Sequence, residues 1–262
     1  MGDADARVIV EDVGAVRTIM LNRPERLNAL DDLLMSDLVD ATADAARDPA
    51  VGCVIVTGAG RGFCAGGDLK PAGRPPVQAS ADRGGRVEQS FDRLRYFMEA
   101  PRLLHEMGKP TIAMINGPVA GAGIGIAGAC DLRFAAESAT FLSAFDRIGG
   151  GGDFGATWFW TKILGSGAAR ALFILGEKIE ASEAFRQGLY TRLFPDAVLR
   201  ESTMEIAQRL ANGPRMSWRY MKDNLNRAED GVFEAALDAE ALNMGLSISA
   251  TAVIARAGRD AV

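Results

Sequence analysis

The stretch VIVTGAGRGFCAGGDLK, residues 54–70, runs from an apolar segment typical of a buried strand into a turn rich in glycine. A second stretch, IAMINGPVAGAGIG at residues 112–125, repeats this order of strand, glycine turn and helix. Each turn can present a backbone N–H at the end of a strand, near the start of a helix. Two such donors converging on one point would stabilise a developing oxyanion. The same spacing also fits two ordinary turns, so the residues alone leave both interpretations open.

Strands and helices alternate around these two stretches, which predicts an α/β core over residues 1–197 and a helical region over residues 198–262. Residues 8–22 alternate as a hairpin does, with Gly14 near its turn. The segment 71–86 is rich in Pro, Gly and charge, and it predicts a mobile loop inside the core. Apolar spacing predicts further helices at residues 30–46, 88–106, 198–212, 214–228 and 231–257.

The composition is that of a folded protein of moderate acidity. Of 262 residues, 48% are hydrophobic, and a net charge of −5 gives no reason to expect a nucleic acid partner. Cys53, Cys64 and Cys130 stand singly, which argues against disulfides or structural zinc and for a reducing compartment. With no apolar run long enough for a bilayer and no basic-then-apolar leader, we expect a cytoplasmic protein without a membrane partner.

The sequence lacks the motifs of several familiar nucleotide-binding and hydrolytic enzymes. Gly123, Gly125 and Gly128 form a literal GxGxxG, but several residues separate it from the strand that ends near Asn116. Close packing of a helix explains these small residues more simply than a nucleotide site. No GxxxxGK[ST] or GxSxG occurs, and His105 is the one histidine of the chain. A structural or solvent-facing position is therefore favoured for His105 over a catalytic one.

Four segments, read in order, resemble the enoyl-CoA hydratase/isomerase (crotonase) superfamily: RPERLNAL at 23–30, GRGFCAGGDLK at 60–70, KPTIAMINGPVAGAGIGIAGACDLRFAAESATF at 109–141 and ILGSGAARALFILGEKIEASEAFRQGL at 163–189. The resemblance implies a spiral core of stacked ββα turns, with C-terminal helices that form homotrimers, which commonly pair into hexamers. It also implies an acyl-CoA thioester substrate, with coenzyme A as part of that substrate and no tightly bound cofactor. By position, the two amides that would hold the thioester oxygen belong to Gly67 and Ala122. The coenzyme A contacts of the family map to Arg26, Leu27, Ala29, Ala65, Asp68, Leu69 and Gly121.

Departures from the family pattern narrow the expected reaction. Hydratases of the family use two glutamates, whose positions are held here by Gly125 and Phe145. Neither residue transfers protons, and Asp146 is offset by one position, which normally changes the direction of a side chain. The histidine base of the related dehalogenases would fall near Met98, where no histidine is present. Ordinary hydration and hydrolytic dehalogenation are therefore not expected.

Asp153, in IGGGGDFGATW, matches an aspartate that two branches of the superfamily use, among them an isomerase branch. A carboxylate between glycines and aromatic residues is poorly solvated, which raises its pKa towards the range useful for proton transfer. We therefore expect an acyl-CoA isomerase with Asp153 as the proton-transfer residue. Alternatives are a residual hydratase or another Asp-dependent thioester reaction, a non-catalytic binder of CoA thioesters, and an Asp153 that merely caps the following helix. The segment 71–92 lies where the family places a wall of the acyl pocket, so the acyl group stays open.

Overall fold

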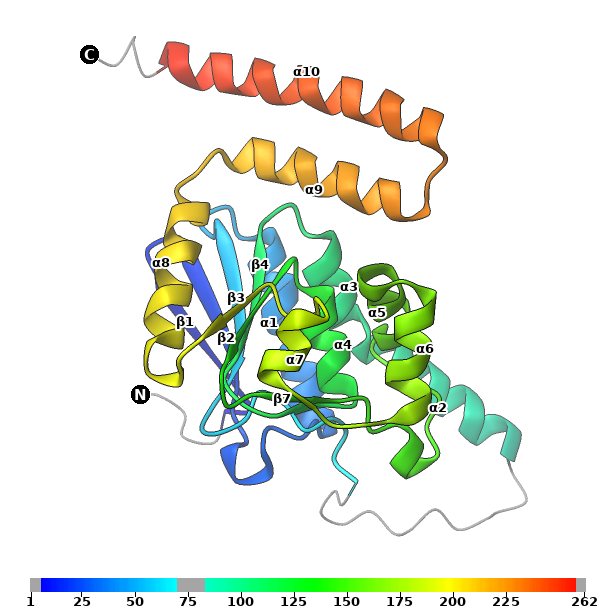
Figure 1. The fold of residues 1–262 in the computed structure, drawn as a ribbon. Coiled ribbons are helices and arrows are strands. Elements are labelled where there is room, and N and C mark those ends of the chain that lie inside the picture. The colour runs from blue at the N-terminus through cyan, green and yellow to red at the C-terminus, as the bar shows by residue number, and fades with distance from the viewer. Residues whose placement is uncertain (1–5, 70–82, 258–262) are drawn as a thin grey trace.

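The computed structural model of the protein describes residues 6–69 and 83–257, which form a mixed α/β fold built on two sheets (Figure 1). The larger sheet has the strand order β1-β2-β3-β4-β6-β9, and the smaller has the order β5-β7-β8. The larger sheet consists of β1 (Val8–Val13), β2 (Val16–Leu21), β3 (Cys53–Gly58), β4 (Thr111–Ile115), β6 (Leu132–Ala136) and β9 (Arg192–Phe194). The smaller sheet consists of β5 (Val119–Ala120), β7 (Thr140–Leu142) and β8 (Ile179–Glu180).

Strands β3 and β4 are buried along their whole length. Because successive side chains of a strand point to opposite faces, this burial means that both faces of the sheet are covered. Helix α8 (Leu199–Ala211) packs against β2, β3, β4 and β6, while α1 (Asp32–Arg47) packs against β1 and β2. The expected hairpin is confirmed: β1 and β2 are antiparallel, and Gly14 adopts a φ of 60° between them.

Helix α4 (Ala122–Ala129) carries the second glycine turn into the core, and all eight of its residues are buried. It packs against α5 (Ala156–Leu164), where the Trp160 indole N–H donates to the Ile124 carbonyl at 3.0 Å. A Cβ on Gly128 would lie 2.9 Å from the Cβ of Phe159. The packing explanation of the small residues is therefore confirmed in this helix.

The region expected as a single helix over 88–106 consists of α2 (Arg83–Phe97) and α3 (Glu99–Glu106), separated at Met98. Pro101 explains the break, because proline has no N–H to donate back to Phe97 and its ring crowds that carbonyl. The loop expected over 71–86 is wrong for its last four residues, which begin α2. The rest of that loop lies outside the described residues.

The three expected C-terminal helices are confirmed as α8, α9 (Arg215–Asp230) and α10 (Phe233–Ala257). Helix α8 lies on the large sheet, whereas α9 and α10 form a separate layer above the core (Figure 1). The remaining helices are α6 (Ser166–Leu175) and α7 (Ala181–Arg186), with short 3-10 turns η1 (Pro24–Arg26), η2 (Asp146–Ile148) and η3 (Asp196–Val198). Within residues 6–69 and 83–257, no helix combines the length and apolar character that a bilayer crossing needs.

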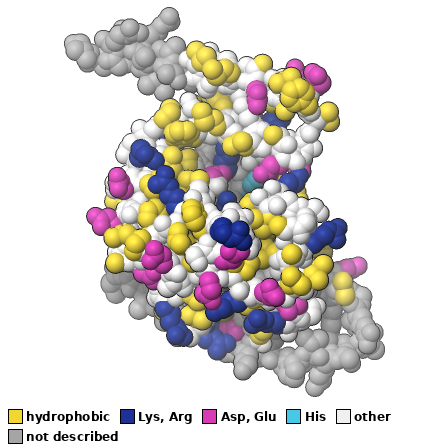
Figure 2. All heavy atoms as spheres, in the orientation of Figure 1, with side chains coloured by type: hydrophobic (Ala, Val, Ile, Leu, Met, Phe, Trp, Pro, Cys, Tyr) yellow, Lys and Arg dark blue, Asp and Glu magenta, His cyan; other side chains and the backbone are white. Residues whose placement is uncertain are grey.

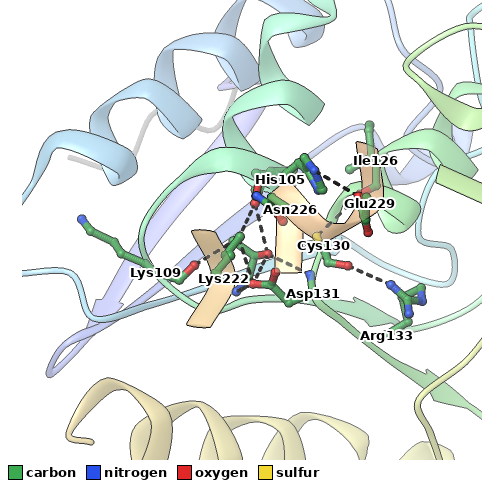
Figure 3. A network of polar contacts seen from close by, with 11 residues as sticks. His105, Lys109, Ile126, Cys130, Asp131, Arg133, Lys222, Asn226 and Glu229 are labelled. Atoms are coloured by element: carbon green, nitrogen blue, oxygen red, sulfur yellow. Dashed lines mark hydrogen bonds and ion pairs between the residues drawn. The ribbon is translucent and has the colours of Figure 1, made fainter. Parts of the chain in front are cut away.

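A buried lysine ties α9 to the core (Figure 3). The Lys222 ammonium is buried and donates to the Leu104 carbonyl at 2.8 Å and to the Asp131 carboxylate at 2.9 Å. One turn further along α9, the Asn226 amide donates to the His105 carbonyl at 3.0 Å. Since a buried ammonium needs several acceptors to offset its desolvation, this contact fixes the position of α9.

Candidate active site

The two glycine turns lie side by side. A parallel bridge joins Cys64 to Val119, and the Ala120 N–H donates to the Cys64 carbonyl at 2.8 Å. A Cβ placed on Gly66 would lie 3.4 Å from the Ala122 nitrogen. The structure thus brings together two segments more than fifty residues apart, as the sequence had suggested.

The N–H groups of Gly67 and Ala122 are not taken up by backbone hydrogen bonds in the described residues. Leu30 hydrogen-bonds to the residues on either side of Gly67: its N–H donates to the Gly66 carbonyl at 2.8 Å, and its carbonyl accepts from the Asp68 N–H at 2.9 Å. Because backbone groups alternate in an extended segment, the exposed Gly67 directs its own N–H away from Leu30. Ala122 is the first residue of α4, where N–H groups have no intrahelical acceptor. No backbone acceptor within the described residues takes either N–H.

Gly121 sets the direction of the second amide. Its φ of 52° and ψ of −129° belong to a region that residues with a Cβ rarely enter. This conformation turns the chain from β5 directly into α4, so the Ala122 N–H stands at the positive end of the helix. The sequence mapped Gly121 to coenzyme A binding; its conformation gives it a role in positioning the Ala122 amide.

The Asp153 carboxyl group is partly buried and has one oxygen without a partner. Its Oδ1 is fully buried and accepts no hydrogen bond from the described residues. Burial raises the pKa of Asp153 to about 6. The same carboxylate helps to raise the pKa of the Cys64 thiol to about 12, after the larger effect of burial, so Asp153 lies within electrostatic range of the first turn.

The alternative in which Asp153 caps the next helix is not supported. Helix α5 begins at Ala156, its N-cap is Gly155, and no side chain within the described residues caps it. Only the main-chain carbonyl of Asp153 takes part, accepting from the Ala156 N–H at 2.9 Å. The side chain is therefore left for another role.

Apolar groups fill both positions where hydratases of the family carry glutamate. A Cβ on Gly125 would lie 2.6 Å from the Phe154 carbonyl oxygen and 2.7 Å from its Cβ, so the segment carrying Asp153 rests on this glycine. Phe145 is buried and stacks on Phe173 with ring centroids 6.0 Å apart. The space that a side chain at residue 125 would need is occupied by the segment that carries Asp153.

Several of the residues mapped to coenzyme A contact one another beside the first turn. The Ala65 N–H donates to the Leu27 carbonyl at 2.9 Å, and Arg26 pairs with the Asp68 carboxylate at 2.9 Å. Leu69 is exposed, whereas Ala29 is buried.

Sequence reasoning missed Arg23, which lies among these residues. Its buried guanidinium binds Asp68 at 2.9 Å and pairs with Asp31 at 3.3 Å. It also donates to the Ala29 carbonyl. Arg23 is the first residue of the RPERLNAL motif, so the motif could have indicated it as a site residue. Its partner Asp68 lies far along the chain and could not be inferred from the motif.

Within residues 6–69 and 83–257, no cluster of three or more His, Cys, Asp or Glu side chains is suited to a metal ion.

Comparisons with known proteins identify the family of the chain. A family model described as enoyl-CoA hydratase/isomerase matches residues 11–255. The 1,2-epoxyphenylacetyl-CoA isomerase of Escherichia coli (strain K12) is 35% identical over 225 residues, covering 86% of this chain and 84% of that protein. The 4-chlorobenzoyl coenzyme A dehalogenase-1 of an Arthrobacter species is 30% identical over 248 residues, covering 94% and 87%. The crystal structure of an enoyl-CoA hydratase from Bacillus anthracis superposes with a TM-score of 0.81 at 28% identity, covering 91% and 90%. The chain therefore belongs to the enoyl-CoA hydratase/isomerase family of enzymes.

Proposed function

We propose that this enzyme is an acyl-CoA isomerase that moves a carbon–carbon double bond along the acyl group of a CoA thioester. In this proposal the amides of Gly67 and Ala122 hold the thioester oxygen, and Asp153 transfers the proton. The single observation that carries it is the buried Oδ1 of Asp153, which accepts no hydrogen bond from the described residues and lies within electrostatic range of the first glycine turn.

The reaction needs one base and one site for negative charge. With a pKa of about 6, Asp153 is mostly ionised at neutral pH and removes a proton from the carbon next to the thioester carbonyl. The electron pair of that C–H bond moves into a dienolate, whose charge on the thioester oxygen is stabilised by the two N–H donors. A single donor of this kind contributes about 3 kcal/mol in well-studied enzymes. The Asp153 carboxylic acid then returns its proton to the far end of the dienolate, so atoms and charge balance with one carboxyl group.

Hydration by the two-glutamate route is the less favoured reaction, since it needs a second carboxyl group where Gly125 and Phe145 stand. The absence of that pair also keeps a non-catalytic binder of CoA thioesters as the second candidate. The buried Asp153 Oδ1, which accepts no hydrogen bond from the described residues, argues against the binder, because a polar atom kept out of water without a partner is costly and calls for a functional reason. Coenzyme A enters only as part of the substrate, and self-association as a homotrimer or hexamer stays a prediction.

The test follows the conversion of trans-3-hexenoyl-CoA to the conjugated 2-enoyl thioester by its ultraviolet absorbance. We expect the wild type to react, Asp153→Asn to lose at least about a hundredfold in kcat, and exposed Asp146→Asn to keep wild-type activity. The rate should also rise with pH through about 6. An Asp153→Asn enzyme as active as the wild type would refute the assignment. Binding of hexenoyl-CoA with no turnover by the wild type would favour the binder.

A further inference from the structure

A cavity of about 400 Å³ lies between the α2–α3 junction, α5 and α9. Figure 2 shows that the surface is hollowed between the C-terminal helices and the core, with acidic and basic side chains around the hollow. Met98, Pro101, Trp158 and Phe159 give the cavity apolar walls, and His105 and Asn226 add polar groups. None of its lining residues has been given a role in the reaction above.

The cavity lies next to the segment that carries the catalytic carboxylate. Phe154 and Gly155, which follow Asp153 directly, form part of its lining. The backbone of Phe154 rests on Gly125, which is three residues beyond the Ala122 amide and therefore about one helical turn away. The reacting end of an acyl group held by that amide would thus lie close to the cavity.

The walls are suited to a flat ring. The His105 ring lies 5.3 Å, centroid to centroid, from Trp158 at 77° and from Phe159 at 60°. These edge and tilted contacts are the geometries in which aromatic groups prefer to pack against one another. A cavity of about 150 Å³ holds a benzene molecule, and ligand pockets commonly measure about 300–1,000 Å³. The space here is therefore sufficient for a substituted ring.

The charges around the cavity do not favour an anionic ligand. Arg95 and Arg102 both line it, yet both donate to the Glu99 carboxylate, at 2.8 and 2.7 Å. Arg102 is also paired with Glu106. With both guanidinium groups compensated, a carboxylate would gain no free cation in exchange for its lost hydration.

His105 supplies a neutral hydrogen-bonding group inside the cavity. Burial, and then the Lys222 charge, lower its pKa, so the ring is neutral at pH 7 and has one donor and one acceptor nitrogen. Its Nε2 lies 3.6 Å from a Glu229 carboxylate oxygen, which is longer than a hydrogen bond (Figure 3). The ring can therefore exchange this weak contact for a hydrogen bond to a ligand.

We propose that this cavity binds the end of the acyl group remote from the thioester, and that it selects an uncharged aromatic end carrying a hydroxyl or carbonyl oxygen within reach of His105. The inference rests on the proposed function in one respect, namely that the thioester oxygen binds at Gly67 and Ala122. It adds the class of substrate that the enzyme prefers, which is an aryl-substituted acyl-CoA.

Binding measurements test this inference without any turnover. Isothermal titration compares acetyl-CoA, phenylacetyl-CoA, (4-hydroxyphenyl)acetyl-CoA and the carboxylate-ended adipoyl-CoA. We expect phenylacetyl-CoA to bind at least about tenfold tighter than acetyl-CoA, the hydroxylated ring to bind tighter still, and adipoyl-CoA to gain nothing over acetyl-CoA. Trp158→Leu should reduce the preference for the ring. His105→Phe, which keeps the ring packing, should remove only the additional gain from the hydroxyl group. Trp218→Phe, outside the cavity, is the matched control, and circular dichroism verifies the fold of each variant.

Equal affinities for acetyl-CoA and phenylacetyl-CoA would overturn the inference. An aromatic preference that survived unchanged in both folded cavity variants would also overturn it, because the ring would then bind elsewhere. Tighter binding of adipoyl-CoA than of phenylacetyl-CoA would overturn the assignment of an uncharged end. If the ring preference depends on Trp158 while hexenoyl-CoA is not isomerised, the cavity assignment is supported and the proposed reaction fails. The two outcomes are therefore distinguishable.

Discussion

Replacing Asp153 by asparagine should stabilise the protein while it abolishes the reaction. The carboxyl group has a pKa of about 6 in the folded chain, against an ordinary value of 3.8, because burial disfavours its ionised form. Each tenfold change in proton affinity corresponds to about 1.36 kcal/mol, so the ionised group costs up to about 3 kcal/mol of folding free energy. Asparagine has a similar shape and carries no charge, so it removes that cost.

The sign depends on pH in a defined way. Between pH 3.8 and about 6 the unfolded chain has lost the Asp153 proton while the folded chain still holds it. The unfolded state then binds fewer protons, so the contribution of this group to stability falls as the pH rises through that window. Well above pH 6 the destabilisation caused by the ionised Asp153 no longer changes with pH. The advantage of Asp153→Asn should therefore be about a third of its full value at pH 4.5 and reach its full value at pH 8.

Urea denaturation at pH 4.5, 6 and 8, monitored by circular dichroism, measures this difference. Asp146→Asn is the matched control, because Asp146 lies seven residues away on an exposed turn and its replacement should change stability by less than about 0.5 kcal/mol. An Asp153→Asn protein less stable than the wild type at pH 8 would refute the reasoning. It would show that the carboxylate makes a favourable contact in the folded chain, as a helix cap does.

Three further substitutions probe the site and its support. Gly121→Ala should cost about 1–3 kcal/mol of stability, because alanine is strained at a φ of 52°. It should also lower kcat at least about tenfold, because relief of that strain would turn the Ala122 amide. Gly167→Ala, at an open helical position, is the control in both the denaturation and the kinetic assays. Gly125→Glu should lower stability and isomerase activity without hydratase activity appearing, because its Cβ would meet the Phe154 carbonyl at 2.6 Å; water addition to crotonyl-CoA by a folded variant would contradict this. Lys222→Met should lower the free energy of unfolding by about 1–3 kcal/mol and increase hydrogen exchange in α9, because three acceptors lose their donor. Unchanged exchange in α9 would show that other contacts hold this helix.

The larger features of the fold were predictable from sequence because they depend on local pattern. The buried strands β3 and β4 are largely apolar runs, and helices α8 and α9 show clear apolar periodicity. The break at Met98 was missed although Pro101 carried a local signal for it. Strands of two residues, such as β5 and β8, are too short to have a period and are formed only by their partners.

The candidate site was predictable in part. The glycine turns suggested two amide donors, and the surroundings of Asp153 suggested a raised pKa, because both depend on neighbouring residues in the chain. The contact between Gly125 and Phe154 was not predictable, since it joins α4 to a loop by tertiary packing alone. The pairing of Arg23 with Asp68 is likewise set by the fold, across 45 positions of sequence.

The close contact of Phe154 with Gly125 has a consequence for how such enzymes change their reactions over evolutionary time. A glutamate introduced at residue 125 would place an acid on α4, but it would also displace the neighbouring loop, which carries Asp153. A side chain at residue 125 and the Phe154 backbone would occupy the same volume, so on the proposed mechanism an acid cannot be added on α4 without moving the segment that carries Asp153. On the proposed mechanism, a change from one of these reactions to the other would first require a different shape for residues 152–155. The present shape of this loop therefore opposes the addition of an acid at residue 125.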